Sequence, residues 1–207
     1  MTDITEKHKA MIQKTLLITG FDPFDGETVN PSREAIKLLP DTVGGYRLHK
    51  LEIPVEFGRG AEIAIKAAEE LSPDAILCVG LAGGRQAMTP EVLAVNIRDA
   101  GSPDNAGYKP SFEPVVPGGR EAYFTTLPAR EMTAAISAAG LPASLSFSAG
   151  VYVCNDLLYF LLHRFAGTEV RVGFIHVPFI PEQGKKGKPS MSLNDIAKGL
   201  AAAIEAL

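Results

Sequence analysis

The sequence predicts an α/β protein with a largely parallel sheet that helices cover on both sides. Segments 15–19 and 75–79 are apolar without alternation, which is typical of strands buried on both faces. Segments with helical periodicity, such as 57–71, alternate with these strands along the chain. Several strands also run directly into glycine-rich or polar loops. A parallel sheet between two helical layers accounts for all three observations.

The first half of the chain supplies three expected strands and two expected helices. Residues 1–14 are polar and mixed in charge, and we expect them to form a flexible leader. The apolar strand 15–19 ends at Gly20, and a helix over 30–39 starts with Asn30 as N-cap and Pro31 at the first helical position. A second strand is expected at 46–55. The helix 57–71 ends at Ser72-Pro73-Asp74, and the strand 75–79 follows.

The second half continues the alternation within the same domain, which we expect to span 15–207. Residues 99–120 are rich in Gly, Pro, Asp and Asn, and a loop of that length in a compact domain is usually functional. Gly140 stops one helix, and Ser192 is the expected N-cap of the last helix. The expected strands are 91–97, 144–148 and 170–177, the expected helices are 129–139, 155–165 and 192–206, and 181–190 is a polar loop.

Composition narrows the class of protein. The net charge of −4 gives no basic field that would attract nucleic acid. No apolar run approaches the roughly 20 residues that span a bilayer, and the N-terminus lacks the apolar region of a signal peptide, so we expect a cytoplasmic protein. The two cysteines, Cys78 and Cys154, do not suggest a disulfide framework, because the cytosol is reducing. Each cysteine therefore has to be explained as a thiol.

Four unusual segments follow the predicted strands or begin just past them. They cover residues 20–26, 80–91, 149–155 and 176–183. In open α/β sheets, ligands bind outside the carboxyl ends of the strands. The site is therefore expected among these segments.

Cys154 is the candidate nucleophile, because it precedes an apolar helix. A thiol at a helix N-terminus lies near the positive end of the macrodipole, which favours the thiolate. The N–H groups there can also stabilise an oxyanion. The alternative for Cys154 is a small buried hydrophobe, and that is the expected fate of Cys78, which lies inside an apolar strand.

His176 is the candidate base, selected from four histidines. His8 lies in the leader, and His49 lies in an expected exposed strand. His163 is nine residues along the same helix as Cys154, which places it roughly 13 Å away on the opposite face. His176 ends the strand 170–177, so it emerges at the same sheet edge as Cys154. Its alternative is a core histidine with satisfied hydrogen bonds.

Glu91 is the candidate partner that orients the base. An ordinary solvated glutamate is the alternative, and Asp99 and Asp104 in the long loop are competing carboxylates. The glycine-rich stretch that ends at Arg85 is not followed by a Walker lysine. No His/Cys cluster has the spacing of metal ligands, so neither a metal nor a cofactor is expected.

Five ordered segments resemble the pyroglutamyl peptidase I (pyrrolidone-carboxylate peptidase) family of cysteine peptidases. The resemblance covers about residues 15 to 205. Its segments are Thr19-Gly-Phe-Asp-Pro-Phe24 with Asn30-Pro-Ser32, Gly80-x-x-Gly-Gly-Arg85 with Thr89-Pro-Glu91 and Ala94-Val-Asn96, Pro103-Asp-Asn105-x-Gly107, Ser148-Ala-Gly-Val-Tyr-Val-Cys154-Asn155, and Gly173-Phe-Ile-His176 through Gln183.

The resemblance implies a three-layer α/β/α sandwich of the phosphorylase/hydrolase-like kind, often assembled as a homotetramer. It implies a triad of Cys154, His176 and Glu91 that releases pyroglutamate from the N-terminus of peptides. Phe21 and Phe24 match positions that line the pocket for the pyroglutamyl ring. Two positions depart from the family, and both imply lost polar groups near the site. Leu81, near the pocket, replaces a frequent Gln, and Gly101 replaces a usual Arg.

Two other functions remain open from the sequence. A nucleoside phosphorylase-like enzyme shares the broad architecture and would need an anion site, for which Arg85 is the candidate. A non-catalytic descendant that binds peptides is suggested by Leu81 and Gly101. The complete set of thiol, imidazole and carboxylate favours the peptidase.

Overall fold

The central sheet of the computed structural model has six strands in the order β2-β3-β1-β4-β8-β5. The structure describes residues 13–207. The four inner strands are parallel to one another, whereas the two-residue strands at the edges are antiparallel to their neighbours. The largely parallel sheet predicted from the sequence is confirmed. The bounds are β1 Lys14–Phe21, β2 Thr42–Val43, β3 Tyr46–Ile53, β4 Ala75–Leu81, β5 Thr89–Pro90 and β8 Arg171–Val177.

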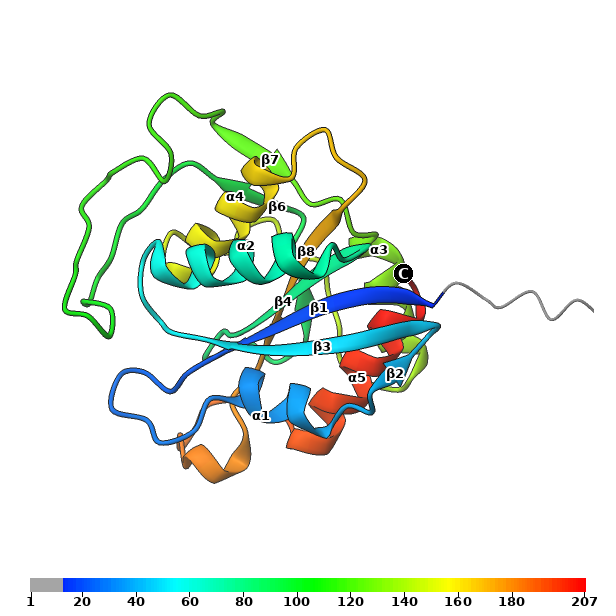
Figure 1. The fold of residues 1–207 in the computed structure, drawn as a ribbon. Helices are drawn as coiled ribbons and strands as arrows, with labels where there is room; N and C mark the ends of the chain where they lie inside the picture. Colours follow the sequence, from blue (N-terminus) through cyan, green and yellow to red (C-terminus); the bar gives the residue numbers. More distant parts are fainter. Residues whose placement is uncertain (1–12) are drawn as a thin grey trace, which may run out of the picture.

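Helices form a layer on each face of this sheet (Figure 1). On one face, α2 (Arg59–Leu71) packs beside α4 (Val153–Arg164). On the other, α5 (Leu193–Glu205) contacts both α1 (Pro31–Leu38) and α3 (Ala129–Ala138). A second, two-stranded sheet of β6 (Leu93–Val95) and β7 (Ala122–Phe124) lies against α4. The result is the expected three-layer sandwich.

Strand alternation divides the interior into two apolar cores. Successive side chains of a strand point to opposite faces. In β4, Ile76 and Cys78 therefore join the core beneath α2 and α4, whereas Leu77 and Val79 join the core beneath α1, α3 and α5. We call the side of the sheet that α2 and α4 cover the α2/α4 face. Every proposed catalytic side chain lies on this face or reaches it.

The helix starts follow the capping chemistry expected from the sequence. Asn30 caps α1, and its Oδ1 accepts a hydrogen bond of 3.1 Å from the backbone N–H of Ser32. Ser192 caps α5, and its Oγ accepts 3.1 Å from the N–H of Asp195. Both N-cap predictions are confirmed.

Several sequence-based boundaries were wrong or too broad. Residues 144–148 form no strand; the segment has only two isolated bridges, Ala143 just before it with Met88 and Ser146 within it with Glu91. Their neighbour β5 is only two residues long, so no continuous ladder is available. The expected strand 91–97 contracts to β6, in the smaller sheet. Helix α4 starts at Val153, earlier than 155, and Lys14 already belongs to β1 rather than to the leader. The rest of the expected leader, residues 1–12, lies outside the described residues.

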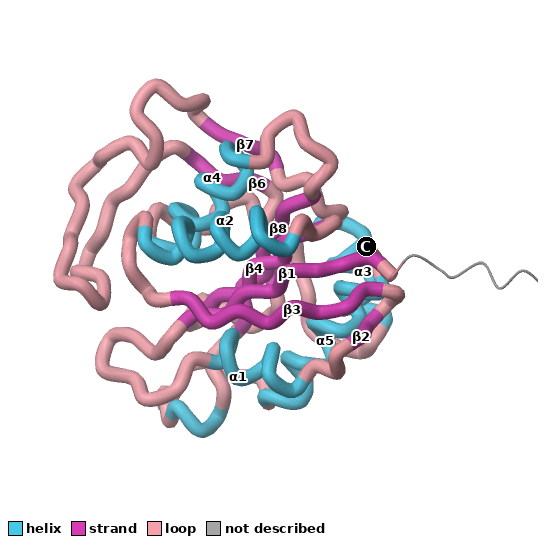
Figure 2. The backbone as a smooth tube through the Cα atoms, viewed as in Figure 1, coloured by secondary structure: helices cyan, strands magenta, loops and turns pink. Residues whose placement is uncertain are grey.

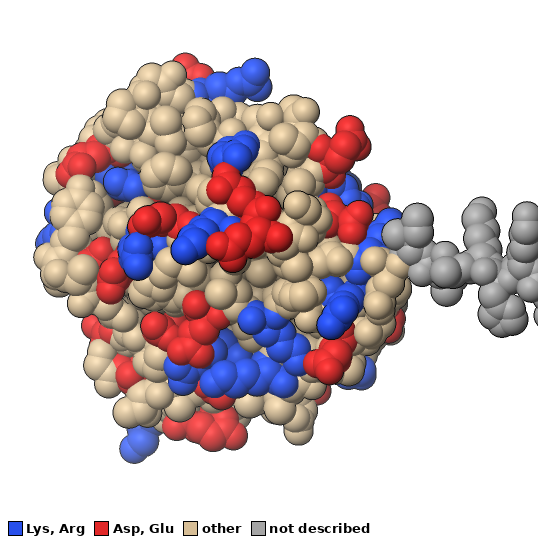
Figure 3. All heavy atoms as spheres, viewed as in Figure 1, with Lys and Arg blue, Asp and Glu red and all other residues tan. Residues whose placement is uncertain are grey.

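The loops gather beyond the carboxyl ends of β1 and β3, as Figure 2 shows in pink. Residues 99–120 contain neither helix nor strand, as expected from their composition. Several hydrogen bonds attach this long loop to the body of the protein, among them two that involve side chains. Asp104 accepts from the N–H of Phe57 at 2.9 Å, and Tyr152 donates its hydroxyl to the Pro103 carbonyl at 3.0 Å. On the face drawn in Figure 3, acidic and basic side chains are interspersed.

The central strand β4 provides a stability test. Leu77 is 0% exposed and packs in the core beneath α1 and α5, so Leu77→Ala should lower the free energy of unfolding by about 2–5 kcal/mol. Leu38, half exposed at the end of α1, is the matched control, and Leu38→Ala should change it by less than about 0.5 kcal/mol. Urea unfolding followed by circular dichroism measures both. Equal losses in the two variants would contradict the assigned core.

Candidate active site

His176 and Gly80 lie side by side at the carboxyl ends of β8 and β4. The register pairs these two residues directly, so both face the α2/α4 side of the sheet. The Sγ of Cys154 reaches the sheet at this point. A Cβ atom on residue 80 would lie 3.0 Å from that sulfur and 2.7 Å from the Cζ of Phe174. Only glycine leaves room there for the thiol.

The thiol and the imidazole thus share their immediate neighbours. Phe174 touches the same space from β8, and its ring centroid lies 4.6 Å from that of His176. Within residues 13–207, no hydrogen bond joins Cys154 to His176, and the imidazole bonds Glu91 instead.

The start of α4 fixes the position of Cys154. Tyr152 is the N-cap, which makes Cys154 the second residue of the helix, in its first turn. The next residue, Asn155, is fully buried. Its amide accepts from the N–H of Val95 at 2.9 Å and donates to the carbonyls of Val95 and Ile97 at 2.9 and 3.1 Å. Sequence reasoning did not assign this anchoring role, although Asn155 stands inside the nucleophile motif.

Glu91 and His176 form a buried hydrogen-bonded pair. The distance from His176 Nδ1 to Glu91 Oε1 is 2.7 Å, and the two residues are 3% and 1% exposed. Glu91 follows the edge strand β5, which runs antiparallel to β8 and so brings the carboxylate back along the imidazole. The structure brings together these two residues, which are 85 positions apart in the sequence.

Arg85 also binds Glu91. Its Nη1 lies 2.7 Å from the same Oε1 and donates to the Thr89 hydroxyl as well. Its Nη2 donates to the Ser148 carbonyl at 3.1 Å. The sequence suggested Arg85 only as an anion site for the phosphorylase alternative. In the structure its guanidinium is already engaged by these three acceptors.

The pair is set for a neutral imidazole beside an anionic carboxylate. Burial lowers the pKa of His176 below its ordinary value and outweighs the hydrogen bond and charge of Glu91, while Arg85 lowers it further. Burial alone would raise the pKa of Glu91. The contacts that Glu91 makes with His176 and Arg85 outweigh burial, so this pKa is lowered.

Cys154 is a protonated thiol at rest, not the thiolate expected from its helix position. Burial raises the pKa of Cys154 to about 12, and the negative charge of Glu91 raises it further, whereas Arg85 opposes them. The residue is partly exposed as a whole, yet its sulfur lies against Gly80 on the sheet.

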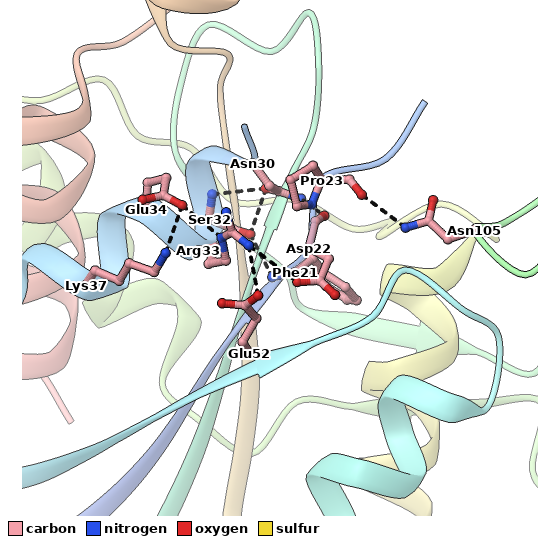
Figure 4. Close-up of polar contacts among 10 residues, drawn as sticks. All are labelled: Phe21, Asp22, Pro23, Asn30, Ser32, Arg33, Glu34, Lys37, Glu52 and Asn105. Atoms are coloured by element: carbon pink, nitrogen blue, oxygen red, sulfur yellow. Dashed lines mark hydrogen bonds and ion pairs between the residues drawn. The ribbon is translucent and has the colours of Figure 1, made fainter. Parts of the chain in front are cut away.

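The loop that carries Phe21 and Phe24 is held in place at the end of β1. Phe21 is buried and Phe24 half-buried, and both pack on the α2/α4 side. Figure 4 shows the backbone bonds that hold the loop. The N–H of Phe21 donates to Ser32 Oγ at 3.0 Å, and the side-chain amide of Asn30 donates to the carbonyl of Asp22 at 2.9 Å.

Two further contacts connect this loop to its surroundings (Figure 4). The amide of Asn105 donates to the Pro23 carbonyl at 3.0 Å, which joins the long loop to the phenylalanine loop. Arg33 pairs with Glu52 at 2.8 Å and with Asp22 at 3.6 Å. The two phenylalanines are therefore presented by a loop with several anchors.

Leu81 and Gly101 lie differently from the other predicted residues. Strand alternation points the side chain of Leu81 away from the α2/α4 face. Gly101 is exposed in the long loop, with open space where a side chain would be.

The rejected candidates have other partners. His163 Nδ1 lies 2.9 Å from the Tyr123 hydroxyl, and His49 lies in β3. Asp104 accepts from the backbone N–H groups of Phe57, Ala106 and Tyr108. Cys78 is fully buried in the core, where burial raises its pKa to about 12. His8 lies outside the described residues.

A cavity of about 700 Å³ borders Arg85 rather than the thiol. Neither Cys154 nor His176 lines it, and its walls come from Arg85–Ala87, Thr89 and Ser144–Ser148.

In the part of the chain that the structure describes, no helix has the length and apolar character needed to cross a membrane.

A three-layer α/β sandwich with a thiol, an imidazole and a carboxylate at one sheet edge places this chain in the class of cysteine peptidases. The model of the pyroglutamyl peptidase family matches residues 14–207. The chain belongs to this family.

Relatives and solved structures agree with that assignment. The pyrrolidone-carboxylate peptidase of Levilactobacillus brevis is 50% identical over 196 residues, covering 93% of this chain and 96% of the relative. A crystal structure of Bacillus amyloliquefaciens pyroglutamyl peptidase I is 41% identical, with a TM-score of 0.90 over 93% of this chain and 96% of that one. A mutant pyrrolidone carboxyl peptidase from Pyrococcus furiosus is 43% identical, with a TM-score of 0.87 over 93% of this chain and 97% of that one.

The buried pair predicts loss of stability on acidification. Because the native pKa of His176 lies below its ordinary value of 6.5, the unfolded chain binds more protons between these two values. The stabilisation is therefore present above pH 6.5 and decreases as pH falls through the window beneath it. The lowered pKa of Glu91 acts in the same direction below its ordinary value of 4.5.

Urea midpoints at pH 7.5 and 5.5 measure this effect. We expect the parent midpoint to fall on acidification, and the fall to be smaller in His176→Asn, which keeps a donor for Glu91 but cannot ionise. His49→Asn is the control and should behave like the parent. An identical pH response in His176→Asn and the parent would contradict this account of the buried pair.

Proposed function

We propose that this chain hydrolyses the amide bond that follows an N-terminal pyroglutamyl residue and releases 5-oxoproline. Membership of the pyroglutamyl peptidase family supports this activity. The geometry of the site provides the main structural support for this activity. His176, oriented by a 2.7 Å bond to Glu91, is paired in the sheet with Gly80, against which the sulfur of Cys154 lies.

The chemistry begins from a neutral thiol and a neutral imidazole. Because Nδ1 of His176 is engaged by Glu91, Nε2 is left to accept the thiol proton. As Nε2 takes this proton, Sγ of Cys154 attacks the carbonyl carbon and a carbon–sulfur bond forms. Glu91 stabilises the resulting imidazolium. Backbone N–H groups in the first turn of α4 stabilise the negative charge that develops on the carbonyl oxygen.

Collapse of this intermediate releases the peptide. His176 returns the proton to the leaving amine as the carbon–nitrogen bond breaks, which leaves a thioester on Cys154. Water, deprotonated by His176, then attacks the thioester. Pyroglutamate leaves, and Cys154 regains its proton. The cycle requires no metal or cofactor.

Phe21 and Phe24 are the proposed side-chain walls of the ring pocket, and Leu81 is proposed to border the pocket through its backbone. The pyroglutamyl ring is small, flat and uncharged, so aromatic walls and a few amide hydrogen bonds can select it. Phe21 supports this role because it ends β1 on the α2/α4 side, where the thiol also lies. An apolar Leu81, with Gly101 in the long loop, offers fewer polar contacts than the usual family residues and can weaken affinity or shift preference.

We further propose that residues 15–207 act as one catalytic domain in the cytoplasm and assemble as a homo-oligomer, a tetramer by the family resemblance. Phe124 and Phe147 support assembly, because they are 73% and 62% exposed and border the same hollow. Subunit contact is one way in which such apolar surface is covered. The phosphorylase alternative loses its main residue, since Glu91 occupies the guanidinium of Arg85.

Removal of the thiol is the direct test of the activity. Cys154→Ala should reduce hydrolysis of a pyroglutamyl amide reporter by at least about 10³-fold, because the nucleophile is gone, with an unchanged circular dichroism spectrum. An alkylating reagent should inactivate the parent. Cys78→Ala, the matched control, should keep its turnover and remain sensitive to the reagent. Retained turnover in Cys154→Ala would reject the mechanism. A parent that binds pyroglutamyl peptides without turnover would instead indicate the non-catalytic alternative.

Phe21→Leu tests the pocket, since it keeps apolar bulk and removes the aromatic face. An aromatic contact is worth about 0.5–1.5 kcal/mol, so KM for the reporter should rise roughly two- to tenfold while kcat changes less. Phe124→Leu, on the exposed strand β7, should leave KM unchanged. Steady-state kinetics distinguishes the two, and an unaltered KM in Phe21→Leu would remove this residue from the pocket.

A further inference from the structure

We propose that Arg85 is a positioning residue that keeps Glu91 a buried anion while His176 stays neutral and ready to accept the thiol proton. The inference rests on the proposed function, in which His176 is the base. Arg85 is not a member of the triad, and the sequence motifs give it no positioning role.

Charge balance gives the first argument. Glu91 is 1% exposed, and a carboxylate away from water is costly unless a positive charge lies close to it. A neutral imidazole supplies a hydrogen bond but no charge. Arg85 Nη1, 2.7 Å from the same Oε1 that faces His176, supplies the charge. Glu91 is therefore balanced before His176 takes up any proton.

The surroundings of His176 give the second argument. The ionisable groups that face this site are Glu91 after β5, Arg85 from the β4–β5 loop, Cys154 from α4 and Cys78 from β4. Both cysteines are protonated at neutral pH, because burial raises each pKa to about 12. Among these groups only Arg85 is a permanent cation. Its charge lowers the pKa of His176 and opposes the rise in the pKa of Cys154.

The reach of the guanidinium gives the third argument. Its planar fork contacts Glu91, the Thr89 hydroxyl and the Ser148 carbonyl at once. Thr89 lies in β5, and Ser148 begins the segment that leads to Cys154. The Arg85 side chain thus connects Glu91 to the segment that leads to Cys154. Lysine can replace the charge but not the fork.

Substitution of Arg85 therefore changes protonation as well as rate. In Arg85→Met the Glu91–His176 pair must balance the carboxylate by taking up a proton, so proton uptake by the pair moves to higher pH. The acid limb of kcat/KM should move with it. We expect kcat to fall roughly 10- to 100-fold, because the pair is no longer held in position, with little change in KM. Arg85→Lys keeps the charge, so it should keep the acid limb and lose part of kcat.

The experiment compares the parent, Arg85→Met, Arg85→Lys and Arg164→Met. Arg164 is the matched control, since it pairs with Glu69 at the surface of α4, away from the site. Two quantities are measured for each protein. One is the pH dependence of reporter hydrolysis. The other is the NMR titration of the His176 imidazole, assigned with His176→Asn, which does not depend on turnover.

The outcomes separate this proposal from the activity itself. An acid limb and an imidazole titration that move to higher pH in Arg85→Met alone support it. A lower kcat with an unmoved titration makes Arg85 merely structural and overturns the proposal. If Arg85→Met does not fold, Arg85→Gln replaces it, because glutamine keeps hydrogen-bonding groups and removes the charge. A titration that moves to higher pH in Arg85→Gln supports the proposal, and an unmoved one overturns it. A parent without turnover rejects the proposed function, and the NMR titration still tests Arg85.

Discussion

The buried contact between Glu91 and His176 is the interaction on which the arrangement of this site depends. It joins the edge strand β5 to β8 on the face that carries the start of α4. Water is excluded there, so the contact is strong, and the same exclusion makes an unbalanced charge costly. This cost explains the neighbours of the pair, because Arg85 supplies a compensating positive charge and the sulfur of Cys154 is uncharged.

A set of loops surrounds this fixed centre and is itself well anchored. The phenylalanine loop is bonded to the start of α1 and to the long loop, and the long loop is bonded to the start of α2 through Asp104. These contacts join segments that are far apart in the sequence. A substrate pocket formed between such loops inherits its shape from hydrogen bonds to backbone groups, which tolerate changes in neighbouring side chains.

Much of this organisation could be predicted from the sequence, for identifiable reasons. Apolar runs marked the buried strands, and Asn30 and Ser192 marked helix starts, because these signals are local. The order of strands placed His176 at the same edge as Cys154. Arg85 and Asn155 escaped assignment, because their roles depend on where distant backbone carbonyls lie. The raised pKa of Cys154 could not be predicted from the sequence either, because the sulfur is buried against Gly80 in β4 and Phe174 in β8.

The absence of a side chain at position 80 has a practical consequence. A single methyl group there would meet both the sulfur of Cys154 and the ring of Phe174 at less than ordinary contact distance. Gly80→Ala would thus displace the nucleophile without altering any reacting group. The product would be a dormant form that retains its thiol, imidazole and carboxylate, suited to capturing an uncleaved peptide for crystallography.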